Sequence, residues 1–531
     1  MIATMTRGRG LRRGLGALTG VGALCATMAA PAAQARQSAQ APAAPKPGGS
    51  IAITFPYGAP DCLDPQKTAL GASFAVFSSV VDALFSTDDK GRIRPYLATG
   101  YTYNASGTEL TVSLRHGVRF SNGDPFDASA VKYTFDRALN PATKSPATAG
   151  SLSSLKSTQV VDPYTVRLVL KTPYRPLLTQ LAIAYEGILD PKAPPTCQNV
   201  VGTGPFKISN VGAGYSTVTV VRNPYHTFEP PWAHNGGAAY LDKITFRSIT
   251  SDATRVSELL SGGVDISDIA GSQLVRVRGA AGIAQHRILN QGSAWLGYNF
   301  AHAPFDRLEV RRAVAQAIDR KALVTGAFGG LAVPSYSMVG SAMPFYDKAA
   351  PSYAPTYDVA AAQKALAGSN AMHGRYTLLT IAQPQYTQLA ELIQAELAQI
   401  GLNVNIVAKP IGEYIPVAAK GQYDLLLLDY GYPDPDFLYQ VLHSSQGKGA
   451  GLNFTNYKSA TLDSLIIKGR STTDQGQAAA TYAQLQRFID TNVIMDPLVT
   501  PVSLFGVRSR VQGWHTSSDT SILYQDLYVG S

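Results

Sequence analysis

A chain of 531 residues is longer than one hydrophobic core can organise, so the sequence predicts two or more lobes. Hydrophobic residues make up 45% of the chain and charged residues 15%, a balance that excludes bulk disorder. The net charge of +9 is mild for this length, and four of the arginines lie within the first 13 residues. No Lys/Arg-rich block follows them, so nucleic acid is not expected as a partner.

Residues 1–35 have the pattern of an export signal. Four arginines precede a weakly apolar stretch, residues 14–30, and Ala33-Gln34-Ala35 then offers the small-x-small pattern that signal peptidase needs. The stretch is too short and too rich in Gly and Ala to fill a bilayer, so we expect cleavage rather than a membrane anchor. This predicts an exported protein, located at the cell surface or in the periplasm of a Gram-negative cell.

Two details of export stay open. Arg12-Arg13-Gly14-Leu15 is compatible with twin-arginine export, but its flanking residues match that motif poorly. Lipidation of Cys25 would tether the protein to the membrane. We expect Cys25 to be discarded with the leader instead, because Leu24 stands where lipoprotein signals place a small residue. Residues 36–47, rich in Ala, Pro and Gln, predict a disordered tether.

Cleavage would leave two cysteines, Cys62 and Cys197. An even pair in an exported protein usually forms a disulfide, and we expect these two to pair. Such a bond closes a loop of well over a hundred residues, which in the chain-entropy model stabilises by roughly 4 kcal/mol.

The predicted elements of the first half mix strands and helices. Residues 49–55 alternate apolar and polar side chains, as a strand does. An apolar helical stretch follows over residues 74–85, and Asn122-Gly123 supplies the positive-φ turn of a hairpin. Residues 128–139 predict a helix and residues 241–246 another strand.

The second half has βαβ character. Residues 376–381 predict a strand, and residues 386–400 a helix with one apolar face that ends at Gly401. A strand over residues 402–407 follows, so we expect the two strands to be parallel and joined by a right-handed crossover. Residues 425–428, four consecutive leucines, predict a central strand buried on both faces.

Several different short motifs follow one another along most of the chain. They are Leu63-Asp64-Pro65, the Arg-Pro-Tyr-Leu-Ala run at 94–98, the L-R-x-G-V-x-F-x-x-G-x-P pattern at 114–125, Gly-Thr-Gly-Pro-Phe at 202–206, the helix-to-strand step at 256–266, and the N…P-F-D-x-x-x-V-R-x-A…A-I-D-R block at 299–320. In order and spacing the chain resembles the extracellular solute-binding proteins of family 5, which feed peptides and nickel to ABC importers.

The resemblance implies an α/β, two-lobed periplasmic-binding-protein-like fold of type II, of the large class with an extra inserted subdomain, a hinge and a cleft between the lobes. Lobe I would comprise residues 48–76, 200–290 and 496–531, with residues 77–199 as the inserted subdomain and residues 291–495 as lobe II. The implied function is an extracytoplasmic receptor that captures a small solute, in the first place a short peptide, by hinge closure. Its partners would be that ligand and the membrane permease subunits, and we expect it to act as a monomer without a cofactor.

Asp429 is the first candidate for ligand contact. The segment 429–433 resembles the family's D-Y-x-x-P element, whose Asp pairs with the α-ammonium group in peptide-binding members. Asp434 and Asp436 follow it in the densest cluster of acids, and for these two we expect a solvated Pro-rich turn, or helix capping by Asp436. The tandem Pro-Asp-Pro departs from the peptide-receptor pattern, so a receptor for an oligosaccharide or metal chelate is the alternative.

Aromatic residues would supply the wall of the cleft, because they give contact area at low entropic cost. The candidates are Trp295, Tyr298, Tyr430 and Tyr432, with core packing as the alternative for each. Tyr57 joins them because residues 57–61 match a segment that contributes backbone contacts in peptide-binding relatives.

We expect no binding role for Arg311, Arg312 or the histidines. Arg311 and Arg312 lie on a single helix predicted over residues 308–327, where we expect ion pairs with acids such as Asp319. The eight histidines are scattered without helical ligand spacing, so no metal site is expected. No nucleophile, zinc-protease or phosphate-loop motif occurs. We therefore expect no enzyme, with a secreted hydrolase using distant paired carboxylates as the alternative.

Overall fold

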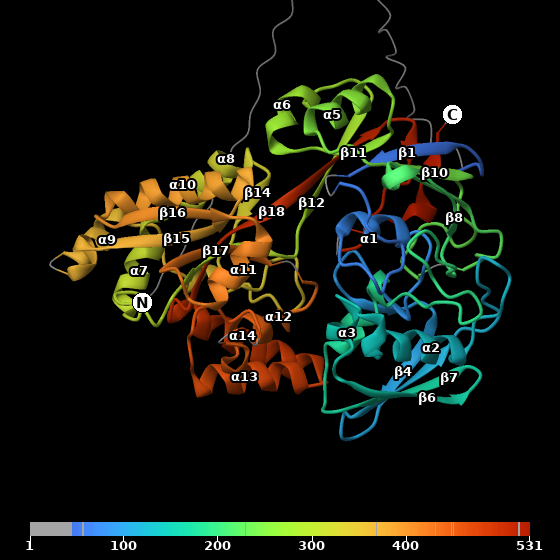
Figure 1. The fold of residues 1–531 in the computed structure, drawn as a ribbon, viewed down its shortest axis with the longest axis horizontal. Helices are drawn as coiled ribbons and strands as arrows, with labels where there is room; N and C mark the ends of the chain where they lie inside the picture. The colour runs from blue at the N-terminus through green and yellow to red at the C-terminus, as the bar shows by residue number, and fades with distance from the viewer. Residues whose placement is uncertain are drawn as a thin grey trace, which may run out of the picture. The chain divides into compact units, whose positions relative to one another are not determined.

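A mixed sheet of twelve strands runs through the part of the chain that the structure describes (Figure 1). The structure is a computed structural model that describes residues 45–55, 58–228, 230–367, 369–430, 432–447, 449, 451–518 and 521–530. The predicted export signal, most of the tether and Tyr57 lie outside these ranges. Within them, no helix combines the length and apolar character that crossing a membrane requires.

Ten strands form the path of the sheet, and two more pair with its central strand. In spatial order they are β16 (Asn403–Lys409), β15 (Arg375–Ile381), β17 (Leu425–Tyr430), β13 (Ser293–Tyr298), β18 (Met495–Arg508), β11 (Ile266–Asp268), β1 (Ser50–Thr54), β10 (Lys243–Arg247), β9 (Thr217–Arg222) and β8 (Phe206–Val211), with β12 (Ile283–Leu289) and β14 (Ala332–Pro334) beside β18. β15 and β16 are parallel, as the βαβ pattern predicts.

Strand β18 belongs to two groups of strands at once. Its first half pairs with β13 and β14, whereas its second half pairs with β11 and with the whole of β12. In Figure 1 it is the long red strand between the β15–β17 group and β11. The chain therefore passes between the groups along β18 and, close beside it, from Leu289 to Ser293.

Helices cover both faces of the part of the sheet that strands β13, β15, β16 and β17 form. One face packs against α7 (Leu308–Ala317), α8 (Arg320–Phe328), α9 (Val359–Leu366) and α10 (Pro384–Gln399). The other packs against α11 (Ile411–Ala419), α12 (Phe437–Leu442), α13 (Ala460–Ser471) and α14 (Gln475–Thr491).

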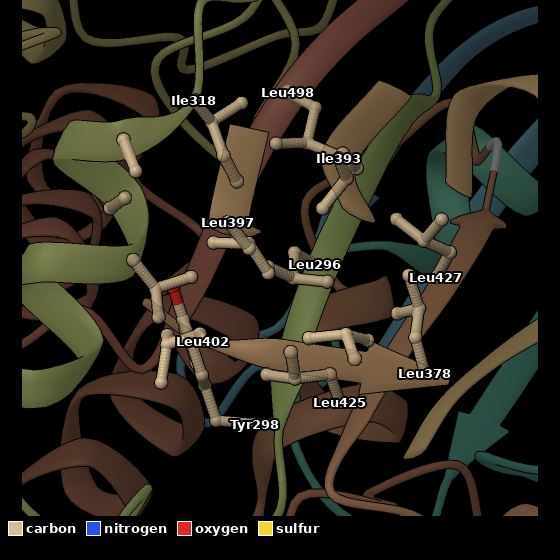
Figure 2. Packing of buried hydrophobic residues seen from close by; sticks show 14 of the residues in the cluster. Leu296, Tyr298, Ile318, Leu378, Ile393, Leu397, Leu402, Leu425, Leu427 and Leu498 are labelled. Atoms are coloured by element: carbon tan, nitrogen blue, oxygen red, sulfur yellow. The ribbon is translucent and has the colours of Figure 1, made fainter. Parts of the chain in front are cut away.

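The four leucines of β17 alternate between these two covered faces. Leu425 and Leu427 point into the first core, which Figure 2 shows, and Leu426 and Leu428 into the second. Burial on both sides explains why the strand is continuously apolar, and it confirms the predicted central strand.

The helix predicted over residues 308–327 is wrong in one respect, since the structure divides it into α7 and α8. The Asp319 carboxylate accepts the backbone N–H groups of Lys321 and Ala322 and begins the second helix. The expected ion pair of Arg311 with Asp319 is also not formed. The buried Arg311 guanidinium instead donates to the backbone carbonyls of Phe305, Asp306, Asn492 and Val493.

Residues 77–199 form a smaller antiparallel sheet with its own core. The strands are, in order, β4 (Ala98–Tyr103), β5 (Glu109–Leu114), β7 (Thr165–Leu170) and β6 (Leu155–Asp162), beside α2 (Ala128–Leu139), α3 (Thr148–Ser151) and α4 (Leu177–Gln180). α2 has the predicted bounds, because Asp127 caps its first turn. At Asn122-Gly123 the turn forms with Gly123 at φ +95°, but only an isolated bridge, Arg119 with Pro125, joins its flanks.

The remaining elements lie around β1 and β11. They are α1 (Gly71–Phe77), α5 (Asp252–Ser261), α6 (Leu274–Val277) and the pair β19 (Val511–Gln512) and β20 (Tyr528–Val529), whereas the pair β2 (Phe85–Thr87) and β3 (Ile93–Pro95) packs in the core of the smaller subdomain. The helix predicted over residues 74–85 is therefore too long. It ends at Phe77, where the hydroxyls of Ser78 and Ser79 donate back to the carbonyls of Ala75 and Val76.

The predicted disulfide between Cys62 and Cys197 is present and joins residues 135 positions apart. Next to it, the Leu63 N–H donates to the Cys197 carbonyl, 3.0 Å away. The bond therefore fastens the segment after β1 to the end of the smaller subdomain.

Replacing both cysteines with alanine should lower the free energy of unfolding by about 4 kcal/mol, because the unfolded chain regains the freedom of a long loop. Denaturant unfolding of the protein starting at residue 36 measures this, with wild-type protein in reductant as the matched comparison. Two free thiols on denatured, unreduced wild-type protein would contradict the pairing.

Candidate functional site

A cavity of about 820 Å³ lies where several distant segments meet. Its lining comes from residues 53–78, 146–186, 290–292, 429–440 with Arg470, and 503–524. The volume is within the range of small-molecule sites. Because the lining includes residues at the crossover between the two strand groups, any relative movement of those groups would change the cavity.

Residues at the ends of two strands line this cavity. Thr54 and Phe55 stand at the end of β1, and Asp429 stands near the end of β17. In open α/β sheets ligands collect at the carboxyl ends of strands, where loops diverge and leave room. The cavity therefore occupies the position in the sheet at which a ligand is expected.

Asp429 faces the cavity without a cationic side chain among the described residues. It lies opposite Ala294 of β13, and its Oδ2 accepts the Tyr386 hydroxyl at 2.6 Å. Burial raises the pKa of the Asp429 carboxyl above its usual range, and the Tyr386 bond offsets this only in part. The group is thus poised to gain from a positively charged ligand, which would lower that pKa again.

The structure separates the aromatic candidates. Tyr432 lines the cavity with Asp429, whereas the side chain of Tyr430 is outside what the structure describes. Trp295 is 1% exposed and Tyr298 is not exposed at all, and each packs in one of the two cores that flank β13. Neither lines the cavity, because helices cover both faces of their strand.

Other aromatic residues, which sequence reasoning missed, form the apolar wall. Phe74 of α1 packs against Tyr185 with ring centroids 5.1 Å apart. Phe505 of β18 and Tyr524 also line the space. They lie far apart in the sequence and outside any motif, so no local pattern could have grouped them.

The expectation that Asp434 lies in a solvated Pro-rich turn is wrong, because Asp434 is completely buried. Arg175 forms a two-pronged ion pair with it, with Nη2 at 2.8 Å from Oδ1 and Nη1 at 3.0 Å from Oδ2. Thr179 adds a hydroxyl at 3.1 Å. The guanidinium of Arg175 also lies over the ring of Phe345.

Asp436 is buried in the same contact, with an exposed fraction of 8%. It accepts the Tyr174 hydroxyl at 2.8 Å and both the Nε and Nη2 of Arg470, at 2.9 and 3.1 Å. Its side chain makes no capping bond to α12, so the predicted capping role is also wrong. We call the contact of Tyr174 and Arg175 with Asp434 and Asp436 the latch.

The latch joins residues 77–199 to residues 291–495 along one side of the cavity. Its partners are 259 and 262 positions apart in the chain. Both carboxylates are satisfied inside the protein, so they are not available as ionic partners of a ligand.

Arg175→Met should destabilise the protein by roughly 3–5 kcal/mol, because the Asp434 carboxylate stays buried without its cation. The double variant with Asp434→Asn should recover much of the loss by removing that charge. Denaturant unfolding measures both, and Lys132→Met, which breaks an exposed pair with Asp136, serves as the control, with an expected effect below about 1 kcal/mol. Equal effects of Arg175→Met and Lys132→Met would show that the latch contributes little.

One group of potential metal ligands lies outside the cavity lining. His234, His515 and Asp526 place one ligand atom each within 4.8 Å of one another. The Asp526 carboxylate already accepts the backbone N–H groups of His234 and Asn235, at 3.1 and 2.8 Å, and lies 3.1 Å from Nδ1 of His515. The imidazoles stack face to face, an arrangement that fits a hydrogen-bonded turn better than convergent ligands.

Comparison with known proteins points to one family. The bacterial extracellular solute-binding proteins, family 5 Middle, match residues 92–450, which is more than half of the chain. The glutathione-binding protein GsiB of Salmonella paratyphi A is 28% identical over 484 residues, covering 87% of this chain and 91% of GsiB.

Solved structures show the same fold. The ABC transporter substrate-binding protein CtaP of Listeria monocytogenes superposes with a TM-score of 0.80 at 21% identity, over 92% of this chain and 100% of CtaP. The periplasmic binding protein DppA of Helicobacter pylori, in complex with the peptide STSA, gives 0.73 at 24% identity, over 92% of this chain and 99% of DppA.

Proposed function

This chain belongs to the bacterial extracellular solute-binding proteins of family 5, and we propose that it captures a short peptide outside the cytoplasm for an ABC importer. The receptor class follows from the family, whose members deliver solutes to membrane permeases. A peptide as the solute is the finer part of the proposal and rests on the cavity.

The observation that carries the peptide assignment is the Asp429 carboxylate. It is aimed into a cavity of about 820 Å³ and paired only with a tyrosine hydroxyl among the described residues. A carboxylate in a partly dry site attracts an ammonium group strongly, because water competes less for either charge. The α-ammonium of a peptide supplies that charge, and the aromatic wall accepts side chains of varied shape.

The names of two relatives support this choice. GsiB is a binding protein for glutathione, itself a tripeptide derivative, and the DppA structure holds the peptide STSA. A receptor for another cationic or neutral solute of similar size is the alternative, and it would use the same cavity.

The proposed division into lobes gives this cavity a mechanism of closure. Lobe I comprises residues 48–76, 200–290 and 496–531, lobe II residues 291–495, and residues 77–199 the inserted subdomain. The hinge would lie at residues 289–293 and near the middle of β18, where the chain passes between the strand groups. Solute capture by closing two lobes around a hinge is a known mode of motion in binding proteins.

The buried clusters fall close to these boundaries, but they put residues 77–81 and Leu189 with lobe I and Leu498 and Val499 with lobe II. One draws only on residues 84–188, and a second on residues 51–81, 189–266 and 507–527. Two more draw only on residues 294–499. A small fifth cluster joins Leu331 to residues 256–277 and to Leu504 of β18, close to where the hinge would be.

Asp429→Asn should weaken binding of a peptide with a free N-terminus by about 2–5 kcal/mol, because its ammonium group loses the ionic partner inside the cavity. Isothermal titration calorimetry measures the loss. Asp136→Asn, on the exposed surface, is the matched control and should leave the affinity unchanged.

Acetylation of the peptide N-terminus provides the complementary change. It should cost wild type about as much as Asp429→Asn does, and cost the Asp429→Asn variant little further, because both changes remove the same ion pair. Additive losses would assign the ammonium group to another residue. Recovery of cleaved peptide at catalytic stoichiometry would instead reject the receptor in favour of a hydrolase.

A further inference from the structure

A second carboxyl group reaches the cavity from the inserted segment. Glu186 ends the single 3₁₀ turn Ala184–Glu186 and lines the cavity, although only 2% of the residue is exposed. Its Oε1 accepts the Ser151 hydroxyl. Its Oε2 has no hydrogen-bond partner among the described residues. A buried acceptor without a partner costs free energy, so its position at the cavity points to a group that arrives with the ligand.

Gln180 shows the same deficiency nearby in the lining. It is 1% exposed, and its side-chain Nε2 donor is likewise without a partner among the described residues. An acceptor and a donor are thus left open on the same segment of the cavity wall. This pattern is typical of a subsite that is completed by a ligand, rather than of a packed core.

The charges of the described cavity lining do not balance. Glu186, Asp429 and Asp436 contribute carboxyl groups, and Arg470 is the basic side chain facing them. Arg470 donates through two nitrogens to Asp436, so the charges of these two residues neutralise each other. Two carboxyl groups remain, Asp429 on one segment and Glu186 on another, and neither forms an ion pair with a described residue.

We infer that the preferred ligand carries two basic groups, one meeting Asp429 and the other meeting Glu186. Resting on the proposed peptide function, this specifies a short peptide with a lysine or arginine side chain besides its terminal ammonium. The amide donor of Gln180 then serves a carbonyl oxygen of the same ligand. An acidic side chain at that position forms no ion pair, because it meets a neutral carboxyl group while Glu186 is protonated and a like charge once Glu186 is ionised.

The protonation of Glu186 gives the inference a second readout. Burial raises the pKa of the Glu186 carboxyl to about 8, which the hydroxyls of Ser151 and Thr148 on α3 offset only in part. These hydroxyls are its contacts from that helix, and the other charged groups of the described lining are Asp429, Asp436 and Arg470. At neutral pH the empty subsite is therefore mostly protonated, and a bound cation expels the proton.

The direction of the pH dependence follows from this release. Below the free pKa, binding of the second cation must ionise Glu186, so affinity rises with pH, and it levels off once the free carboxyl is already ionised above about pH 8. Asp429 also has a raised pKa, but its ionisation affects every peptide with a free N-terminus. The difference between a lysine peptide and a neutral peptide of the same shape therefore reports Glu186 alone.

The experiment is calorimetric titration with alanine tripeptides that carry lysine, glutamate, or norleucine, which has the lysine side chain without its ammonium group, at the second or third position. Titrations from about pH 6 to about pH 8.5, each in two buffers of different ionisation enthalpy, give affinity and proton release together. Wild type should prefer lysine over norleucine at one position by at least about tenfold, as a partly desolvated charge pair does. The preference should increase with pH, with a proton released on binding.

Glu186→Gln removes the charge but keeps the size of the side chain, and it should abolish both the lysine preference and the extra proton release. Binding of the norleucine peptide should remain within about twofold, which also shows that the variant is folded. Glu391→Gln, on the exposed face of α10, is the matched control. Ser151→Ala offers a second variant, which should move the rise in affinity to higher pH because Glu186 loses a hydrogen bond.

Two failures are distinguishable. If wild-type protein binds alanine and norleucine peptides with no gain from lysine at either position, or if Glu186→Gln keeps the preference, the inference is overturned and the peptide receptor stands. If no peptide binds, the peptide function fails, and 1,5-diaminopentane becomes the probe. Binding of the diamine that is lost in both Asp429→Asn and Glu186→Gln supports the two-carboxyl site, and no binding overturns it.

Discussion

A carboxylate that loses its water must meet a cation, collect several hydrogen bonds, or take up a proton. This constraint sorts the acids around the cavity into two kinds. Asp434 and Asp436 meet Arg175 and Arg470 inside the protein and hold distant segments together. Among the described residues Asp429 has one tyrosine hydroxyl for a partner, and Glu186 has only hydroxyls of α3. The first kind contributes to the structure, and the second is left for something the chain itself does not supply.

The position of Asp429, Asp434 and Asp436 relative to strand β17 determines which of them forms an ion pair within the protein. Asp429 lies on β17, whose pairing with β13 fixes its direction, so its carboxylate is held at the strand end with little freedom to seek a cation elsewhere. Asp434 and Asp436 lie beyond the strand, where the chain can turn toward Tyr174 and Arg175. Rigid support for a ligand contact is valuable, because a group that is already in place loses little entropy on binding.

Local patterns of the sequence located many of the elements but could not assemble the site. The bounds of α2 follow from its apolar periodicity and the Asp127 cap, and the burial of Leu425–Leu428 follows from their continuity, because both signals lie within a few residues. Periodicity failed at Asp319, where a capping side chain interrupts an otherwise helical pattern. Trp295 and Tyr298 could not be placed from sequence, since an aromatic side chain packs equally well in a core or a cavity wall. The burial of Asp434 depends on its ion pair with an arginine 259 positions away, which no local pattern indicates.

In the proposed hinge motion, Asp429 and Asp434 would couple ligand capture to closure. Asp429 lies near the end of β17, and Asp434, which contacts Arg175, follows it in a segment that also contains Pro433 and Pro435. Each proline fixes its own φ and restricts the residue before it, so a short stretch with two of them has few conformations. With Asp429 held by its strand, this segment has few ways to place Asp434 against Arg175. In the proposed hinge motion, closing of the latch withdraws the Asp429 carboxylate from water and strengthens its attraction for a cation, so a bound cation in turn stabilises the closed latch.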